Sequence, residues 1–288
     1  MQVTIEGGVS LFVDIDGFGL VPDGPTMLER PTVVLLHGGP GLDHTMYKGP
    51  DALKLADVAQ VICYDHRGNG RSDWGSPEDW TLDTWADDVV RLCDVLGVVR
   101  PVIIGASFGG FVAQRYLARH PDHPSKVVLL CTTPRLDLDA IEQRFTELGS
   151  EVAGKTAKKF FGGDMSVLGD FLQHCIPLYS TEPLDPDAMR RAVMNFELMG
   201  HFFSGEAVSM DLRAGLAAAC CSVFVIGGEL DPVMPAKMTQ EVAAALPANL
   251  VSYQLLPGVS HLQVAGSAST ALVRDYLRNE TAAPAPPT

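Results

Sequence analysis

The chain has 288 residues, of which 47% are hydrophobic and 19% are charged, a balance that supports one large buried core and excludes a disordered protein. Its formal net charge of −14 disfavours nucleic acids and anionic membrane surfaces as partners, because both repel an acidic protein. The composition therefore favours a single α/β domain with an insertion, acting on a small molecule or a short peptide.

The amino-terminal segment and the cysteines indicate where the protein works. Residues 1–6 contain no basic region followed by an apolar run, and no stretch of the chain reaches the roughly 18 apolar residues of a membrane span. We therefore predict a cytoplasmic protein. The six cysteines are scattered along the chain, without the spacing of a zinc site or the density of a disulfide scaffold, so we predict buried free thiols and no metal.

Short apolar runs rich in β-branched residues alternate with longer segments of helical periodicity. This alternation predicts an α/β fold with a mostly parallel central sheet and helices on both faces. The predicted strands, in chain order, are residues 10–14, 32–36, 58–64, 101–104, 126–130, 223–226 and 251–255. The predicted helices are residues 82–96, 109–120, 235–246 and 268–278.

Between residues 133 and 213 the strand-like runs stop, and apolar residues such as Val193, Phe196 and Phe203 recur at helical spacing. Because this segment lies between two predicted strands, we predict a helical lid over the carboxyl edge of the sheet, where open α/β sheets bind ligands. The predicted division is an α/β core of residues 1–132 and 214–279, a lid of residues 133–213 and a disordered, Ala/Pro-rich tail of residues 280–288.

The segment Gly105-Ala106-Ser107-Phe108-Gly109 has the G-x-S-x-G pattern of a nucleophile elbow, and it lies between a predicted strand and a predicted helix. The serine of such an elbow occupies a strained turn, and the flanking glycines let the strand and the helix pass closely. We therefore predict that Ser107 is a catalytic nucleophile.

A serine hydroxyl is a weak nucleophile at neutral pH, so a base must accept its proton and a third group must orient that base. In elbow enzymes the chain order is serine, then Asp or Glu, then histidine. Of the eight histidines, only His261 lies beyond the insertion. It follows the predicted strand 251–255 in a loop at the carboxyl edge of the sheet, and we predict that it is the general base.

Two carboxylates in the loop after the predicted strand 223–226 compete for the role of the orienting acid. Asp231 lies several residues into the loop, and Pro232 holds it outside a helix, whereas Glu229 lies nearer the end of the strand. We predict that Asp231 orients His261 and that Glu229 is a solvated or loop-stabilising charge.

The tetrahedral intermediate of acyl transfer needs main-chain N–H donors for its oxyanion. Glycines permit the close approach this requires, and the segment 37–41, His-Gly-Gly-Pro-Gly, directly follows the predicted strand 32–36. We predict that the N–H groups of Gly39 and Phe108 form the oxyanion hole and that His37 is a structural residue of the loop. The polar segment 65–72 has no phosphate-binding glycine spacing, so we predict that it braces neighbouring loops.

Three motifs together, HGGPG at residues 37–41, DHRGNGRS at 65–72 and GASFGG at 105–110, resemble the α/β-hydrolase superfamily. Within it, the HGGPG loop is similar to that of the prolyl aminopeptidase (proline iminopeptidase) family. The resemblance covers nearly the whole chain outside the lid and the tail. It implies Ser107 as nucleophile, Asp231 and His261 as its partners, and the HGGPG loop as an oxyanion contributor, in agreement with the residues considered one by one.

In the lid the resemblance weakens. Prolyl aminopeptidases hold the free ammonium group of the substrate with lid glutamates, often in a Trp-x-x-Trp-Glu segment, but Trp74, Trp80 and Trp85 all precede the lid of this chain. Glu197 lies in a segment similar to a second family motif, with a spacing that departs by two residues. The resemblance gives Glu197 as a candidate ammonium ligand, and the alternative is an ordinary carboxylate of a lid helix.

The sequence therefore predicts a serine hydrolase that cleaves a small acyl substrate through an acyl-enzyme and is similar to proline iminopeptidases. A carboxylesterase or lactonase is the first alternative. An enzyme that uses the same triad for acyl transfer or carbon–carbon bond hydrolysis is the second, because fold and triad do not determine the substrate. A non-catalytic binding protein is disfavoured because every element of the triad is present. No cofactor is implied.

Overall fold

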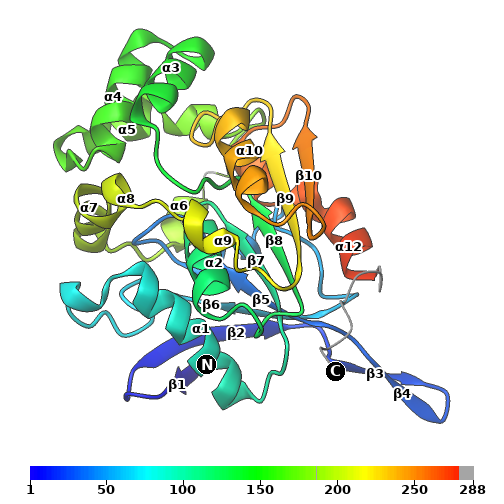
Figure 1. Ribbon diagram of the computed structural model, residues 1–288. Helices are drawn as coiled ribbons and strands as arrows, with labels where there is room; N and C mark the ends of the chain where they lie inside the picture. Colours follow the sequence, from blue (N-terminus) through cyan, green and yellow to red (C-terminus); the bar gives the residue numbers. More distant parts are fainter. Residues whose placement is uncertain (186, 279–288) are drawn as a thin grey trace.

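The apolar runs form the strands of a mixed sheet in a computed structural model that describes residues 1–185 and 187–278 (Figure 1). The sheet has eight strands in the order β1-β2-β6-β5-β7-β8-β9-β10. Strands β5 to β10 are parallel to one another, whereas β2 pairs antiparallel with β1 and β6. The bounds are β1 Gln2–Thr4, β2 Ser10–Asp16, β5 Thr32–Leu36, β6 Gln60–Tyr64, β7 Val102–Ala106, β8 Lys126–Leu130, β9 Ser222–Gly228 and β10 Val251–Leu256.

Helices cover both faces of this sheet because successive residues of a strand point to opposite faces. Val34 and Leu36 of β5 join a core with α1 and α2, while Val33 and Leu35 join a second core with α12 on the other face. The predicted α/β fold is therefore confirmed. These helices are α1 Leu82–Leu96, α2 Phe108–Arg119, α10 Ala236–Ala245, α11 His261–Val264 and α12 Thr270–Arg278.

The segment between β8 and β9 is helical, and its described residues form no strand. Figure 1 shows helices α3, α4 and α5 on the side of the sheet toward which β9 and β10 point. The tail predicted at residues 280–288 lies outside the described residues. The helices of this segment are α3 Leu138–Leu148, α4 Glu151–Phe161, α5 Leu168–His174, α6 Ala188–Arg191, α7 Phe196–Ser204, α8 Glu206–Ser209 and α9 Arg213–Leu216.

Among the differences from the sequence predictions, the edge strand β1 was not predicted. A hairpin of β3 Leu20–Asp23 and β4 Thr26–Glu29 forms a separate two-stranded sheet that was not predicted. The predicted strand 58–64 begins only at Gln60, because the N–H groups of Val58 and Ala59 donate to Leu55 O in a turn. All six cysteines are free, but Cys220 is exposed rather than buried. Among the described residues, no helix is long and apolar enough to span a membrane.

Candidate active site

Ser107 stands alone between β7 and α2, at the tip of a sharp turn. Its φ of 53° and ψ of −118° are strained for a residue with a side chain. The flanking glycines are needed, because a Cβ at Gly109 would lie 2.1 Å from Leu36 O and one at Gly105 would lie 2.4 Å from Gly109 O. The sequence thus folds locally into a turn that presents Ser107 beyond the carboxyl end of a central strand.

The structure brings Asp231 and His261 together, although 30 residues separate them in sequence. His261 Nδ1 donates to Asp231 Oδ2 at 2.7 Å, and both residues are buried. Asp231 Oδ1 accepts from the main-chain N–H groups of Val233 and Met234, each at 2.8 Å. These bonds fix the orientation of the carboxylate, which in turn holds the imidazole through its Nδ1. His261 is the first residue of the short helix α11, not a loop residue as predicted.

Glu229, the competing carboxylate, has different surroundings. It is exposed, and its Oε2 accepts from the N–H of Gly258 at 2.8 Å. Its own main-chain carbonyl accepts from Arg144 of α3 at 2.5 Å. Glu229 therefore braces the turn before His261.

The HGGPG loop lies against the serine. A Cβ at Gly38 would lie 3.2 Å from Ser107 Cβ, and Gly39 has a φ of 68°, which favours glycine. Phe108 is the first residue of α2, so its N–H has no acceptor within the helix. The two amides predicted for an oxyanion hole therefore belong to segments that meet at Ser107.

Two buried imidazoles lie behind this loop. His37 Nδ1 hydrogen-bonds Gly38 O at 3.0 Å, and His37 Nε2 accepts from the N–H of His66 at 3.1 Å. The rings of His37 and His66 pack with centroids 4.4 Å apart, and His66 also packs edge-on against Phe108. Burial lowers the pKa of His37 and holds that of His66 well below its ordinary value. Both rings are therefore neutral supports of the loop at physiological pH.

The segment 65–72 binds the loops around it, as the sequence predicted. Asp65 accepts from the N–H and Nδ1 of His44, at 2.9 and 2.6 Å, and from the N–H of Arg71 at 2.8 Å. Asn69 Oδ1 accepts from the N–H of Gly41 at 2.6 Å. The polar groups of this segment thus hold the HGGPG loop in place.

Asn195 connects the helical insertion to the same loops, a role that the sequence did not reveal. Its main-chain N–H donates to Gly41 O at 2.7 Å, and its Nδ2 donates to Gly68 O at 2.9 Å. Its Oδ1 caps α7 by accepting from the N–H of Leu198 at 3.1 Å. An Asn before a helix is a recognisable cap signal, but its partners across the molecule depend on tertiary packing.

Tyr179, which ends the 3-10 helix Ile176–Tyr179, is a second residue that the sequence did not single out. Its ring packs edge-on against His261 with centroids 5.2 Å apart. The neighbouring Leu178 O accepts from Ser260 Oγ at 2.9 Å. The rings of Phe145 and Phe171, both buried, also pack against Tyr179, so Tyr179 links the aromatic core of the insertion to the His261 ring.

Glu197, the candidate ammonium ligand, lies exposed in the first turn of α7. Its neighbours Leu198 and Met199 are the residues that this turn buries. The structure records no bond that joins Glu197 to the Asp231–His261 pair among the described residues.

A possible metal-ligand set at the same place comprises Cys131, Asp231 and His261, whose ligand atoms lie within 4.8 Å of one another. Burial, with the nearby Asp231 charge, holds the pKa of the Cys131 thiol well above its ordinary value. A protonated thiol is not a metal ligand, and His261 Nδ1 already donates to Asp231. The donor set therefore fits a catalytic acid–base pair better than a metal site.

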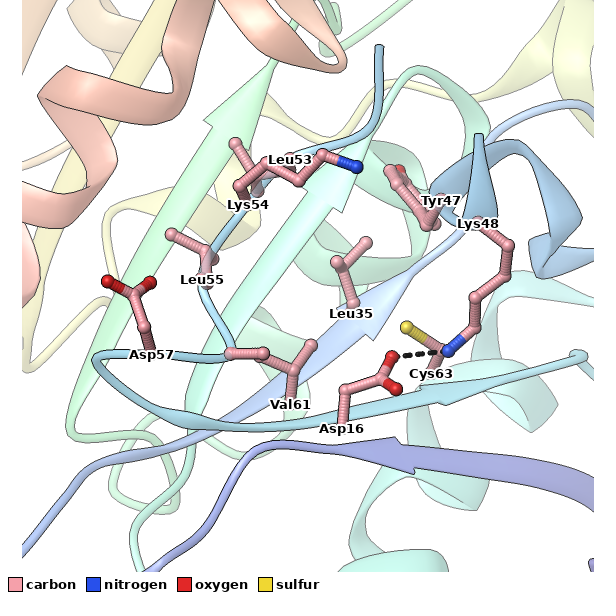
Figure 2. A pocket seen from close by; sticks show the side chains of 11 residues that line it. Asp16, Leu35, Tyr47, Lys48, Leu53, Lys54, Leu55, Asp57, Val61 and Cys63 are labelled. Carbon is pink, nitrogen blue, oxygen red and sulfur yellow. Dashed lines mark hydrogen bonds and ion pairs between the residues drawn. The ribbon is translucent and has the colours of Figure 1, made fainter. Parts of the chain in front are cut away.

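The cavity in Figure 2 is lined by none of these residues. It has a volume of about 400 Å³ and is lined by residues such as Leu35, Tyr47 and Cys63, with Lys48 ion-paired to Asp16 at its rim. No predicted site residue lines it, so we assign it no part in the chemistry.

A serine elbow and a buried Asp–His pair at the carboxyl edge of a mostly parallel sheet define the class of α/β hydrolases. A family profile described as alpha/beta hydrolase fold matches residues 31–265, and the chain belongs to this family. A proline iminopeptidase of Pestalotiopsis fici is 29% identical over 247 residues, which cover 81% of this chain and 86% of the relative.

Two solved structures illustrate the range of activities on this fold. The proline iminopeptidase of Mycobacterium smegmatis has a TM-score of 0.73 at 21% identity, and covers 96% of this chain and 97% of its own. The enol-lactonase of Burkholderia xenovorans LB400 has a TM-score of 0.69 at 25% identity, and covers 97% of this chain and 100% of its own. The fold of the chain is thus shared by enzymes that differ in substrate.

Proposed function

We propose that this protein is a serine hydrolase that works through an acyl-enzyme, with Ser107 as nucleophile, His261 as general base and Asp231 as the orienting acid. The observation that carries the proposal is the conjunction of a strained serine at φ 53° with a buried Asp–His hydrogen bond of 2.7 Å. Neither feature is needed for a stable core, and each lowers the stability of the folded state. A catalytic role explains why both are present.

The chemistry follows from these positions. Ser107 Oγ attacks the substrate carbonyl while His261 Nε2 accepts the hydroxyl proton, and the Asp231 carboxylate stabilises the imidazolium. The N–H groups of Gly39 and Phe108 stabilise the oxyanion, each such donor being worth about 3 kcal/mol in related enzymes. His261 then protonates the leaving group, and a water molecule, deprotonated by His261, releases the acid product and restores Ser107.

We further propose that residues 133–213 act as a lid on a core formed by residues 1–132 and 214–279. The contacts of Asn195 with the HGGPG loop and of Tyr179 with His261 support this proposal, because the first links the insertion to the loop beside Ser107 and the second links it to the base.

For the substrate, the first candidate is an N-terminal prolyl residue, as in proline iminopeptidases. The HGGPG loop and the relative at 29% identity over most of both chains support this candidate. Glu197, in the first turn of α7, is the lid carboxylate we propose for the substrate ammonium group.

The second candidate is a carboxylic ester or a lactone. Two observations favour it: the half-buried Tyr179 places an aromatic surface beside His261, and Glu197 is exposed. An apolar acyl group would pack on that surface without needing a charged partner.

A kinetic comparison of proline p-nitroanilide with p-nitrophenyl acetate tests both the serine-hydrolase mechanism and the substrate class. Ser107→Ala is the blank, and we expect it to lose about 10⁶-fold in kcat while it unfolds at the wild-type temperature. Retained activity in Ser107→Ala would contradict the nucleophile assignment. A strong preference for the prolyl amide supports the iminopeptidase candidate, and a preference for the ester with negligible amide cleavage supports the second candidate.

A further inference from the structure

The β3–β4 hairpin is an apolar element that the rest of the chain leaves uncovered. Phe18 is 72% exposed, Leu20 57%, and Met27 and Leu28 54% each. Figure 1 shows the hairpin extending away from the main sheet, at the end of the molecule opposite α3, α4 and α5. It also lies outside the segment 31–265 that the family profile matches. Exposed apolar side chains gathered on one element mark an interaction surface.

The two edges of the hairpin differ in what they can pair with. Arg30 N–H donates to Gly19 O at 2.8 Å, and the register pairs Leu20 with Glu29 and Pro22 with Met27. Because bonded and non-bonded pairs alternate in an antiparallel ladder, the main-chain groups of the Leu20–Glu29 and Pro22–Met27 pairs point outward. Pro22 has no N–H, which blunts the β3 edge, whereas β4 offers complete outward groups at Met27 and Glu29.

The charge of the chain favours a second copy as the occupant. The net charge of −14 makes two copies repel each other over most of their surfaces, whereas residues 17–30 carry three charges, Asp23, Glu29 and Arg30, which sum to −1. This apolar segment is therefore a place where two copies meet with little repulsion.

From the free edge, the apolar exposure and the low charge together, we infer that β4 pairs antiparallel with β4 of a second copy. When two identical strands pair about a twofold axis, the residues whose main-chain N–H and C=O groups point outward must lie opposite each other. Met27 of one copy then exchanges two main-chain hydrogen bonds with Glu29 of the other, and the axis passes beside Leu28. The result is a four-stranded sheet with Leu28 facing Leu28, remote from Ser107.

Oligomeric state is the first test. We expect analytical ultracentrifugation of the full chain to show a dimer, and Leu28→Lys to raise its dissociation constant at least tenfold. Val99→Lys, at a position 84% exposed after α1, is the matched control because it makes the same charge change. Each substitution reduces the net negative charge by one, so general repulsion cannot explain dissociation. A monomeric wild type, including one whose hairpin is covered by its own residues 279–288, or equal dimers in Leu28→Lys and wild type, overturns the inference.

Cross-linking tests the register. Directly opposed residues of a non-bonded antiparallel pair have Cα atoms about 4.5 Å apart, within the range of a disulfide. In a Cys220→Ser background, which removes the exposed thiol, oxidised Leu28→Cys should run as a covalent dimer while Val99→Cys stays monomeric. Cross-linking that is equal in both, or absent from Leu28→Cys, overturns the pairing at Leu28.

Discussion

Asp231 and Glu229 lie two residues apart after β9, yet the fold gives the two carboxylates different surroundings. Asp231 is fully buried and holds His261 through one oxygen and two main-chain amides through the other. Glu229 is exposed and accepts from one main-chain N–H. The position of Pro232 was enough to prefer Asp231 from the sequence, but the two amides that orient its carboxylate could not be predicted, because they depend on the exact path of the loop.

We therefore predict that Asp231→Asn lowers kcat by about 10⁴-fold, because an amide in this place stabilises the wrong tautomer of the imidazole. Glu229→Gln is the matched control, since its amide oxygen can still accept from the N–H of Gly258. We expect it to keep nearly the wild-type kcat on p-nitrophenyl acetate. Losses of similar size in both variants would contradict the assignment of Asp231.

At the scale of the elements, the buried strands were the easiest to predict from the sequence. β5 and β8 have the predicted bounds because their uninterrupted apolar runs have water on neither face. The β3–β4 hairpin was missed because its short strands contain Pro22 and exposed residues, and its Gly and Pro residues indicate a loop. A hairpin that makes few contacts leaves no periodic pattern in the sequence.

The contacts between the insertion and the core loops could not be predicted from the sequence. Its helical character follows from the spacing of its apolar residues, but the spacing does not specify which core loop each helix meets. The bonds from Asn195 to Gly41 and Gly68, and the packing of Tyr179 on His261, join residues more than 80 positions apart in sequence. Such pairs depend on how the two parts pack together.

We predict that Asn195→Ala destabilises the protein by about 2–4 kcal/mol and lowers kcat/KM. The substitution removes a helix cap worth about 1 kcal/mol and leaves the buried Gly68 carbonyl without its donor, which costs about 1–3 kcal/mol. Urea unfolding and steady-state kinetics measure the two effects.

Ser150→Ala provides the comparison for Asn195→Ala, because Ser150 caps helix α4 of the insertion by accepting from the N–H of Ala153. We expect it to cost about 1 kcal/mol of stability and no activity. If Asn195→Ala kept wild-type kcat/KM, the side-chain bond from Asn195 to Gly68 O would have no catalytic role.

For the whole molecule, acid has two opposing effects on stability. The chain has 35 acidic and 21 basic residues, so protonating carboxylates relieves a general repulsion and favours the folded state. The buried imidazoles act in the opposite direction. Both ring nitrogens of His66 are buried without a hydrogen-bond partner among the described residues, and its pKa is held well below the ordinary value by burial.

The sign of the His66 effect follows from where the proton binds. The unfolded chain takes up a proton on this histidine near pH 6.5, while the folded protein does not until a much lower pH. The contribution of neutral His66 to the free energy of unfolding is therefore complete above about pH 6.5. Below that pH it decreases by about 1.4 kcal/mol for each pH unit.

His66→Phe separates the contribution of His66 to the pH dependence of stability from the general charge effect. The phenyl ring can keep the packing against His37, Tyr64 and Phe108, and the main-chain bond from residue 66 to His37 remains. Between pH 7.5 and pH 5, we expect the free energy of unfolding to fall by about 2 kcal/mol more in the wild type than in His66→Phe. His201→Phe, which removes an exposed histidine, should keep the wild-type slope. Parallel pH profiles for wild type and His66→Phe, measured by urea unfolding, would show that His66 gains a proton in the folded protein, and that a charge can enter the space behind the HGGPG loop.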